Sequence, residues 1–419
     1  MKTVSALTLG CKVNQYDTNA MLGLFREAGY EIVPWGAACD IALVNTCAVT
    51  KTAEHKCRSA IRQAAGRGSA VCVCGCLAQK QKEALLSEAG VCWVVGTAGR
   101  SGIVGLVESG HGKVAAGERS AFEELEIADA GSRTRAVVKV QEGCSNYCAY
   151  CIIPFLRGKP QSRPSASVLR EVDRLTRAGV REIVLTGTNL ASYSDEAGGL
   201  AELIAAVEER WTVGRLRLGS LEPGFFTAEI SRRLADSEIL CPHFHLSLQS
   251  GSARILAAMN RHYSPGEYLR ELDRIRSFFD DPAISTDVMT GFPGEQTEDF
   301  EQTAALVRRA AFARLHVFPY SAREGTRAAR QSGQVPQAER RRRALELIET
   351  GRELEGAYAS SQLGRIHSVL FEEEEDGMAS GYSERYIHVR ARGGQAGTIG
   401  RVRTAQTAEA VLLGTVLAD

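Results

Sequence analysis

The chain of 419 residues is 44% hydrophobic and 24% charged, as in an ordinary soluble globular protein of about three domains, and none of its apolar runs approaches the ~20 residues that span a bilayer. Fifty basic and fifty acidic residues cancel, so net charge offers no general attraction for nucleic acid, and an RNA partner would need a local basic patch. Twelve cysteines without a secretory leader favour a reducing cytoplasm over a disulfide scaffold, and we expect a cytoplasmic protein with no membrane partner.

Short apolar strands alternate with helical patterns over residues 1–128, the first expected domain. The expected strands cover residues 3–9, 41–45, 70–75 and 92–96, and helices are expected near residues 15–27, 50–65 and 80–88. This alternation predicts a parallel sheet covered by helices on both faces, and so an N-terminal α/β domain.

Cys11, Cys47 and Cys76 come directly after strands of this predicted sheet. The carboxyl ends of parallel strands meet at one edge, where open α/β sheets build their sites. Three thiolates converging there have the ligand chemistry of an iron–sulfur cluster with one open iron. The alternative is that they are small buried hydrophobic side chains. We expect that simpler role for the cysteines inside strands, helices and loops, namely Cys39, Cys57, Cys72, Cys74, Cys92 and Cys241.

A segment rich in Gly, Glu, Ala and Ser, residues 110–134, is expected to link this domain to a second one over residues 129–356. Six strands are expected there, at residues 136–141, 182–187, 215–220, 243–248, 284–289 and 315–318. Helical patterns follow the first five strands, and a sixth repeat ends in a helix near residues 337–356. Six β/α units predict an open partial (β/α)6 barrel, with its chemistry at the carboxyl ends of the strands.

A C-x₃-C-x₂-C motif formed by Cys144, Cys148 and Cys151 follows the first of these strands. A structural zinc site would use four closed ligands, usually as two C-x₂-C pairs, and no such pair of pairs occurs here. Three thiolates suit a 4Fe–4S cluster whose fourth iron stays open. The motif resembles the cluster loop of the radical S-adenosylmethionine (SAM) superfamily. That resemblance implies that the open iron binds SAM and that the reduced cluster cleaves it to a 5′-deoxyadenosyl radical.

Polar residues end several of the barrel strands. In the superfamily that this chain resembles, that rim holds SAM, which makes five rim residues cofactor candidates: Thr188, Asn189, Ser220, Glu222 and Gln249. Tyr150 stands where the superfamily commonly places an aromatic ring beside the adenine. The alternative is that residues of these types cap helix starts. His243 and His245 share one face of a strand, and we expect them to be hydrogen-bonded inside the barrel.

Residues 357–419 change to short alternating segments at 367–371, 387–391, 398–402 and 408–416, separated by glycines. This pattern predicts a small antiparallel β-barrel. The domain resembles the TRAM module, which implies tRNA binding, with Tyr382 and Tyr386 as candidate stacking surfaces. The acidic run at residues 372–376 is expected in a solvated turn.

Three segments resemble the signature segments of the methylthiotransferases: Thr8-Leu9-Gly10-Cys11-Lys12-Val13-Asn14-Gln15-Tyr16, Asn45-Thr46-Cys47-Ala48-Val49-Thr50 and Gly75-Cys76-Leu77-Ala78-Gln79. The resemblance implies that Cys11, Cys47 and Cys76 hold an auxiliary 4Fe–4S cluster, so that two such clusters are expected. The segment Cys-Lys-Val-Asn-Gln is closest to the branch that acts on threonylcarbamoyladenosine in tRNA, as are residues 316–321. The isopentenyladenosine branch usually reads Cys-Gln-Met-Asn at the first of these positions.

The implied activity is methylthiolation of C2 of N6-threonylcarbamoyladenosine next to the anticodon, with SAM as methyl donor and radical source. An electron donor and a sulfur source are then expected as partners besides tRNA. The threonylcarbamoyl group carries a carboxylate, which a buried site must meet with a charged partner, and the expected candidates are Arg157, Lys159 and Arg323. The open alternatives are a different methylthiolation substrate (isopentenyladenosine in tRNA or a ribosomal-protein side chain) and a non-catalytic tRNA-binding iron–sulfur sensor.

Overall fold

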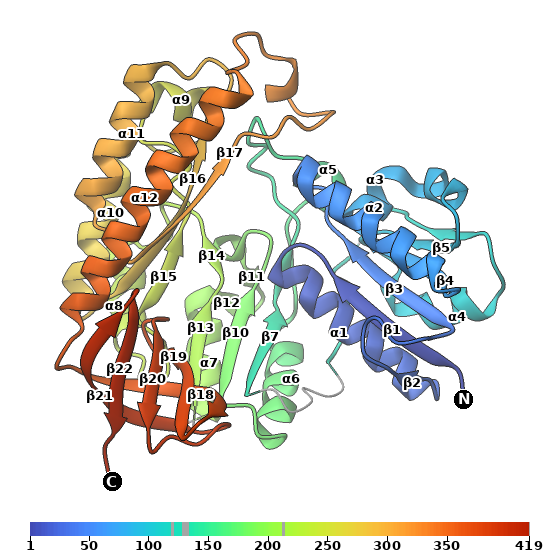
Figure 1. The fold of residues 1–419 in the computed structure, drawn as a ribbon, viewed down its shortest axis with the longest axis horizontal. Helices are drawn as coiled ribbons and strands as arrows, with labels where there is room; N and C mark the ends of the chain where they lie inside the picture. The colour runs from blue at the N-terminus through green and yellow to red at the C-terminus, as the bar shows by residue number, and fades with distance from the viewer. Residues whose placement is uncertain (119–120, 128–133, 212–213, 419) are drawn as a thin grey trace.

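The computed structural model describes residues 1–118, 121–127, 134–211 and 214–418. A helix-covered sheet, an open barrel and a small closed barrel follow one another along the chain (Figure 1). This arrangement confirms the expected fold class. The expected boundary between residues 128 and 129 lies outside the described residues. Among the helices that the structure describes, none is long and apolar enough to cross a membrane.

The N-terminal sheet has parallel strands in the order β2-β1-β3-β4-β5-β6. Helices α1 and α4 pack on one face, where Met21 meets Leu43, and α2 packs on the other, where Ile61 meets Val44. Because alternate residues of β3 enter both layers, this strand is apolar from Ile41 to Val44. The bounds are β1 Thr3–Thr8, α1 Lys12–Glu27, β2 Glu31–Ile32, β3 Ile41–Thr46, α2 Lys51–Gly66, β4 Ala70–Gly75, α3 Cys76–Gln81, β5 Val91–Val95, α4 Ile103–Glu108 and β6 Lys113–Ala115.

The open barrel consists of two parallel sheets, in the orders β13-β10-β7 and β14-β15-β16-β17. The third expected strand divides at Gly219 into β13 and β14, which connects the two sheets along the chain. The last helix continues to Ser361, beyond its expected end at residue 356. The bounds are β7 Arg135–Lys139, α6 Ser165–Arg177, β10 Glu182–Thr186, α7 Leu200–Arg210, β13 Arg215–Leu218, β14 Ser220–Leu221, α8 Ala228–Ala235, β15 His243–Leu246, α9 Ala253–Ala258, α10 Pro265–Phe278, β16 Ala283–Thr290, α11 Thr297–Ala310, β17 Arg314–Pro319 and α12 Gln337–Ser361.

The inner face of the open barrel is polar. Alternate strand residues such as Ile183 and Leu218 pack under the helices, so their neighbours point inward. Arg217 on β13 donates to the carboxylate of Glu182 on β10 at 3.1 Å. His243 and His245 lie 3.4 and 3.1 Å from the Ser285 hydroxyl, which confirms the expected hydrogen-bonded pair.

The C-terminal domain is a closed barrel in the strand order β18-β19-β20-β22-β21, as predicted, around a core that contains Phe371 and Leu412. The acidic run was expected in a turn, but it extends β18, and Glu372 forms an ion pair with Arg135 at 3.2 Å. The bounds are β18 Ile366–Glu375, β19 Met378–Ser383, β20 His388–Arg392, β21 Ile399–Ala408 and β22 Val411–Val416.

The closed barrel sits at the amino ends of the open barrel's strands (Figure 1). Arg215 and Arg217 of β13 donate to backbone carbonyls of the closed barrel at 2.7–3.1 Å. Tyr382 and Tyr386, expected to stack on RNA bases, instead stack on each other with their ring centroids 4.8 Å apart. Arg217 lies over the Tyr386 ring, 4.7 Å from its centroid. These two rings therefore belong to the contact between the barrels.

Helix α1 joins the N-terminal domain to the open barrel, beside β7 (Figure 1). Its residues Met21 and Phe25 enter the N-terminal core, whereas Tyr16 and Ala20 enter the core of the barrel. One helix thus has two buried faces, and this fixes the carboxyl edge of the N-terminal sheet against the barrel.

Candidate active site

The C-x₃-C-x₂-C motif lies in a loop between β8 (Gln141–Glu142) and α5 (Ile153–Arg157). Gly143 begins the loop with φ of +83°, and a Cβ there would overlap the backbone that follows α5. The Cys144 amide donates to the Gly158 carbonyl at 3.1 Å, and the Cys151 amide donates to the Cys148 carbonyl at 2.9 Å. These bonds fold the loop back on itself and leave all three thiols partly exposed.

Burial raises the pKa of Cys151 to about 12 and also raises the pKa of Cys144. The charge of Cys148 adds to both shifts, so the three thiols share one small site. Thiolates, not thiols, bind metals, so a cluster would displace protons here as it binds.

A cavity of about 310 Å³ opens beside Cys148. Asn189, Glu222 and Arg261 line it together with this thiol. Arg261 donates to the Cys148 sulfur at 3.4 Å and to the Glu222 carboxylate at 3.2 Å. The Asn189 side-chain oxygen is buried and has no hydrogen-bond partner in the structure. The cavity therefore offers a carboxylate, a guanidinium and a free amide oxygen next to the cysteine loop.

A smaller cavity of about 120 Å³ lies on the other side of the loop, beside Cys151. Tyr150 and Gln249 line it from the barrel, and Val49 and Thr50 line it from the N-terminal domain. The Gln249 side-chain oxygen is buried and has no hydrogen-bond partner among the described residues, and the Gln249 backbone has φ of +65°. Because Val49 follows Cys47 by two positions, this cavity lies between the two groups of cysteines.

Cys11, Cys47 and Cys76 follow β1, β3 and β4, three neighbouring strands whose carboxyl ends share one edge. The glycines before Cys11 and Cys76 are required sterically. A Cβ at Gly10 (φ +120°) would lie 3.1 Å from the Cys47 Cβ, and one at Gly75 (φ +87°) would overlap the Asn45 side chain. The close approach expected from these glycines is therefore present.

Burial raises the pKa of Cys47 to about 12 and also raises that of Cys76, while the adjacent Arg157 guanidinium lowers the pKa of Cys76. Within the described ranges, no three His, Cys, Asp or Glu side chains are arranged to hold a single metal ion. A zinc ion would draw thiolate ligands to ~2.3 Å from one centre. In a 4Fe–4S cluster each thiolate binds a different iron, so three thiolates at one edge of the sheet can serve three irons.

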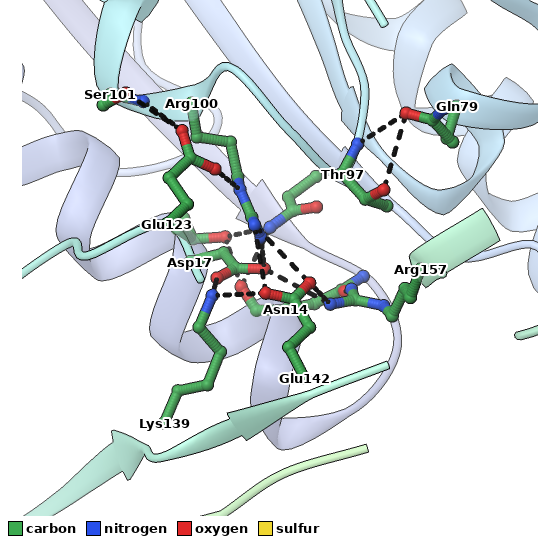
Figure 2. A network of polar contacts seen from close by, with 12 residues as sticks. Asn14, Asp17, Gln79, Thr97, Arg100, Ser101, Glu123, Lys139, Glu142 and Arg157 are labelled. Atoms are coloured by element: carbon green, nitrogen blue, oxygen red, sulfur yellow. Dashed lines mark hydrogen bonds and ion pairs between the residues drawn. The ribbon is translucent and has the colours of Figure 1, made fainter. Parts of the chain in front are cut away.

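A buried ion network connects the two cysteine loops (Figure 2). Lys139 donates to Asp17 at 2.6 Å and to Glu142 at 2.9 Å. Arg157 donates to Glu142 at 2.5 Å and to the side-chain oxygen of Asn14 at 2.6 Å. Asp17 and Asn14 lie on α1 and Glu142 directly precedes the Gly143–Cys144 turn, so these bonds position one loop relative to the other.

Residues 138–307 match the radical SAM superfamily, and residues 3–96 match a family described as uncharacterized protein family UPF0004. The threonylcarbamoyladenosine tRNA methylthiotransferase MtaB of Bacillus subtilis is 36% identical over 410 residues, which cover 94% of this chain and 91% of that protein. MtaB of Thermotoga maritima is 35% identical, and the match covers 98% of this chain and 96% of that protein. The chain belongs to the radical SAM methylthiotransferase family.

A second group within this family is similarly related. The tRNA-2-methylthio-N(6)-dimethylallyladenosine synthase of Mycobacteroides abscessus is 36% identical, with 94% of this chain and 83% of that protein covered. Among solved structures, the radical SAM methyltransferase TsrM of Kitasatospora setae has a TM-score of 0.57 at 13% identity, with 78% of this chain and 77% of that chain covered. This likeness shows a shared fold.

Radical SAM enzymes use a 4Fe–4S cluster and SAM, and the site beside Cys148 fits them. The three thiols of the loop are partly exposed and held in one turn. The amino-acid end of SAM carries an ammonium and a carboxylate, and Glu222 and Arg261 bring the opposite charges to the adjoining cavity. The sequence did not predict Arg261 as a site residue, because it follows α9 and lies at no strand end. Only the fold places its side chain against Cys148.

Two other SAM candidates lie elsewhere. Thr188 and Ser220 line neither of the cavities beside the loop. The Thr188 hydroxyl is buried without a partner, whereas Ser220 is exposed on β14. The structure thus brings Asn189 and Glu222 to the larger cavity and leaves these two residues outside it.

Two of the three basic residues expected to meet a substrate carboxylate are buried in ion pairs. Arg157 is 3% exposed and bonded to Glu142 and Asn14. Arg323 is 3% exposed and bonded to Glu54 of α2. Each guanidinium already uses donors in bonds between domains, and moving it to a substrate would break those bonds. Both residues are therefore corrected to structural residues that hold the domains together. Lys159 is exposed, as a substrate contact requires.

Proposed function

We propose that this enzyme adds a methylthio group to C2 of N6-threonylcarbamoyladenosine next to the anticodon of tRNA, with SAM as methyl donor and radical source. The MtaB relatives, which are named threonylcarbamoyladenosine tRNA methylthiotransferases, support this substrate. The Cys-Lys-Val-Asn-Gln segment at Cys11, which resembles that branch, supports it too.

The main support for the proposal is the cavity between the two groups of cysteines. Cys151 lines it from the barrel, and Val49 and Thr50, which follow Cys47, line it from the N-terminal domain. Transfer of sulfur to a carbon radical requires both reactive centres to reach one substrate atom. An adenine between the two loops would meet that requirement.

In this proposal Cys144, Cys148 and Cys151 hold the cluster that acts on SAM, and Cys11, Cys47 and Cys76 hold a second 4Fe–4S cluster. When bound, SAM and the clusters supply the methyl group, the sulfur atom and the radical that removes the hydrogen of adenine C2. Ile152, Met289 and Phe318 give the shared cavity apolar walls, which keep water from the radical.

For SAM, Glu222 would accept a hydrogen bond from its ammonium and Arg261 would donate to its carboxylate, while Asn189 would accept a further donor. Tyr150 and Gln249 would contact the adenosyl part from the smaller cavity. We also propose that the TRAM-like barrel contacts tRNA. Each turnover consumes electrons and a sulfur atom, so an electron donor and a sulfur source are further partners.

Mass spectrometry of digested tRNA tests the substrate. Cells that lack this protein should keep threonylcarbamoyladenosine and lose its 2-methylthio derivative, and the wild-type gene should restore it. Loss of 2-methylthio-dimethylallyladenosine, with the threonylcarbamoyl product intact, would assign the protein to the other tRNA branch. Release of 5′-deoxyadenosine after reduction with dithionite separates an enzyme from a non-catalytic sensor.

A further inference from the structure

A cavity of about 380 Å³ lies where the three domains meet. Lys12 lines it from α1, Arg135 from β7, Arg217 from β13, and Glu372 and Tyr386 from the closed barrel. Because Arg135 and Arg217 stand in β7 and β13 near the closed barrel, the cavity lies towards the amino ends of these strands, which Figure 1 labels.

The arginines of this cavity already have acidic partners. Glu182, on the inner face of the barrel, binds Arg135, Arg215 and Arg217 at 2.5–3.1 Å. Arg135 also pairs with Glu372. The carboxylates of Glu182 and Glu372 are therefore both paired with arginines.

Lys12 has no such partner. Its ammonium makes no hydrogen bond or ion pair with any residue that the structure describes, and it lines the cavity together with Arg135 and Arg217. The Lys12 side chain is exposed, so a ligand that enters the cavity can reach it. Three cations, Lys12, Arg135 and Arg217, thus line the cavity with one carboxylate, that of Glu372. The cavity therefore has a surplus of positive charge, to which the Lys12 ammonium contributes.

Lys12 also connects this cavity to the reaction site. It directly follows Cys11, at the start of α1. A group attached to a base near the cysteine loops could therefore reach this ammonium through the polar interior of the barrel.

We propose that this three-domain cavity binds the carboxylate of the base's side chain, with Lys12 as its main partner. The inference rests on the proposed function, because a threonylcarbamoyl group carries a carboxylate whereas a dimethylallyl group carries none. Tyr386 and the two arginines add donors for the hydroxyl and amide groups of such a side chain. Lys12 therefore selects between the two tRNA substrates of the family.

The test compares two anticodon stem-loop RNAs that differ at one group: one carries threonylcarbamoyladenosine, the other its methyl ester. Fluorescence anisotropy with the cluster-loaded full chain measures the affinity for each. Wild-type protein should bind the acid about tenfold more tightly than the ester, since a hydrogen bond to a charged group has about that effect. Lys12→Gln should bind the acid and the ester RNA equally, and Lys12→Arg should keep the preference for the acid. Lys113→Gln is the control, because Lys113 is an exposed lysine of β6, and it should behave as wild type.

Equal binding of acid and ester by wild-type protein would overturn the inference, and that comparison needs no variant. A preference that persists in Lys12→Gln would overturn it as well. Equal weakening of both RNAs by Lys12→Gln, with iron content unchanged, would make Lys12 a phosphate contact and not a carboxylate partner. Product analysis keeps the two proposals apart: methylthiolation of acid and ester alike refutes only the Lys12 site, whereas methylthiolation of a dimethylallyladenosine RNA alone refutes the proposed function.

Discussion

Arg157, just after the Cys144–Cys151 loop, donates a hydrogen bond of 2.6 Å to Asn14, just after Cys11. The Asn14 amide in turn donates to the carbonyls of Leu9 at 2.8 Å and Thr46 at 3.0 Å, which precede Cys11 and Cys47. One asparagine thus holds two strand ends of the N-terminal sheet and the cysteine loop of the barrel. The two loops are therefore fixed to each other by a few buried polar groups.

Arg157→Met should destabilise the protein strongly, because the buried carboxylate of Glu142 loses one of its ion-pair partners. Breaking a buried pair of this kind costs about 3–5 kcal/mol. Urea unfolding under anaerobic conditions measures the change. Arg352→Met is the matched control, since Arg352 pairs with Glu349 on the exposed face of α12 and should contribute less than ~1 kcal/mol. Similar losses for the two variants would contradict the structural role of Arg157.

Two sets of three cysteines predict about eight irons in anaerobically reconstituted protein. Replacing Cys144, Cys148 and Cys151 together by Ala should leave roughly half of them. Cys241→Ala, which removes a buried thiol of the barrel, should leave the iron content unchanged. A triple variant without iron, or with its full complement, would show that the two sites are not independent.

Cys76→Ala should lose the auxiliary iron while 5′-deoxyadenosine still forms. Cys74→Ala should keep the iron and cost only about 1 kcal/mol, because this side chain packs in the N-terminal core beside Cys72, 3.8 Å away. Iron analysis and calorimetry distinguish the two variants. The assignment is wrong if Cys74→Ala loses iron and Cys76→Ala retains it.

Gly75→Ala should disrupt the auxiliary site for two reasons, positive φ and overlap with Asn45. Gly29→Ala separates these effects, because Gly29 has a similar φ of +84° but nothing within 4 Å of an added Cβ. Gly29→Ala should lower the free energy of unfolding by about 1–2 kcal/mol, because a left-handed backbone alone is unfavourable by that amount. Gly75→Ala should cost more and also lower the auxiliary iron content. Equal effects in both variants would mean that the close approach to Asn45 is unimportant.

Arg261→Met should weaken SAM binding about tenfold or more, since a charge-assisted hydrogen bond contributes about 1.5–3 kcal/mol. Equilibrium dialysis with labelled SAM measures it on the cluster-loaded protein. Arg254→Met is the control, because Arg254 is exposed and pairs with Asp299 on the outer side of the barrel. Unchanged SAM affinity in Arg261→Met would remove this residue from the site.

The sequence by itself determined the main strands and the position of both groups of cysteines just after them. Strand patterns are local, so β3 and β4 were predictable from their apolar runs, and a thiol just past a parallel strand must lie at the carboxyl edge of the sheet. The motif of Cys144, Cys148 and Cys151 is closed by a few adjacent residues and is equally local. These features need no knowledge of distant partners.

Only the tertiary structure decided what each charged residue does. Arg157, Arg323 and Lys12 look alike in the sequence, as single basic residues near functional segments. Folding brings Glu142 to the first and Glu54 to the second, whereas the third forms no ion pair with any described carboxylate. A buried cation must be paired, because an unpaired buried charge is costly. Its partner is distant in the chain, so only the fold shows whether a basic residue forms a buried ion pair or can bind a ligand.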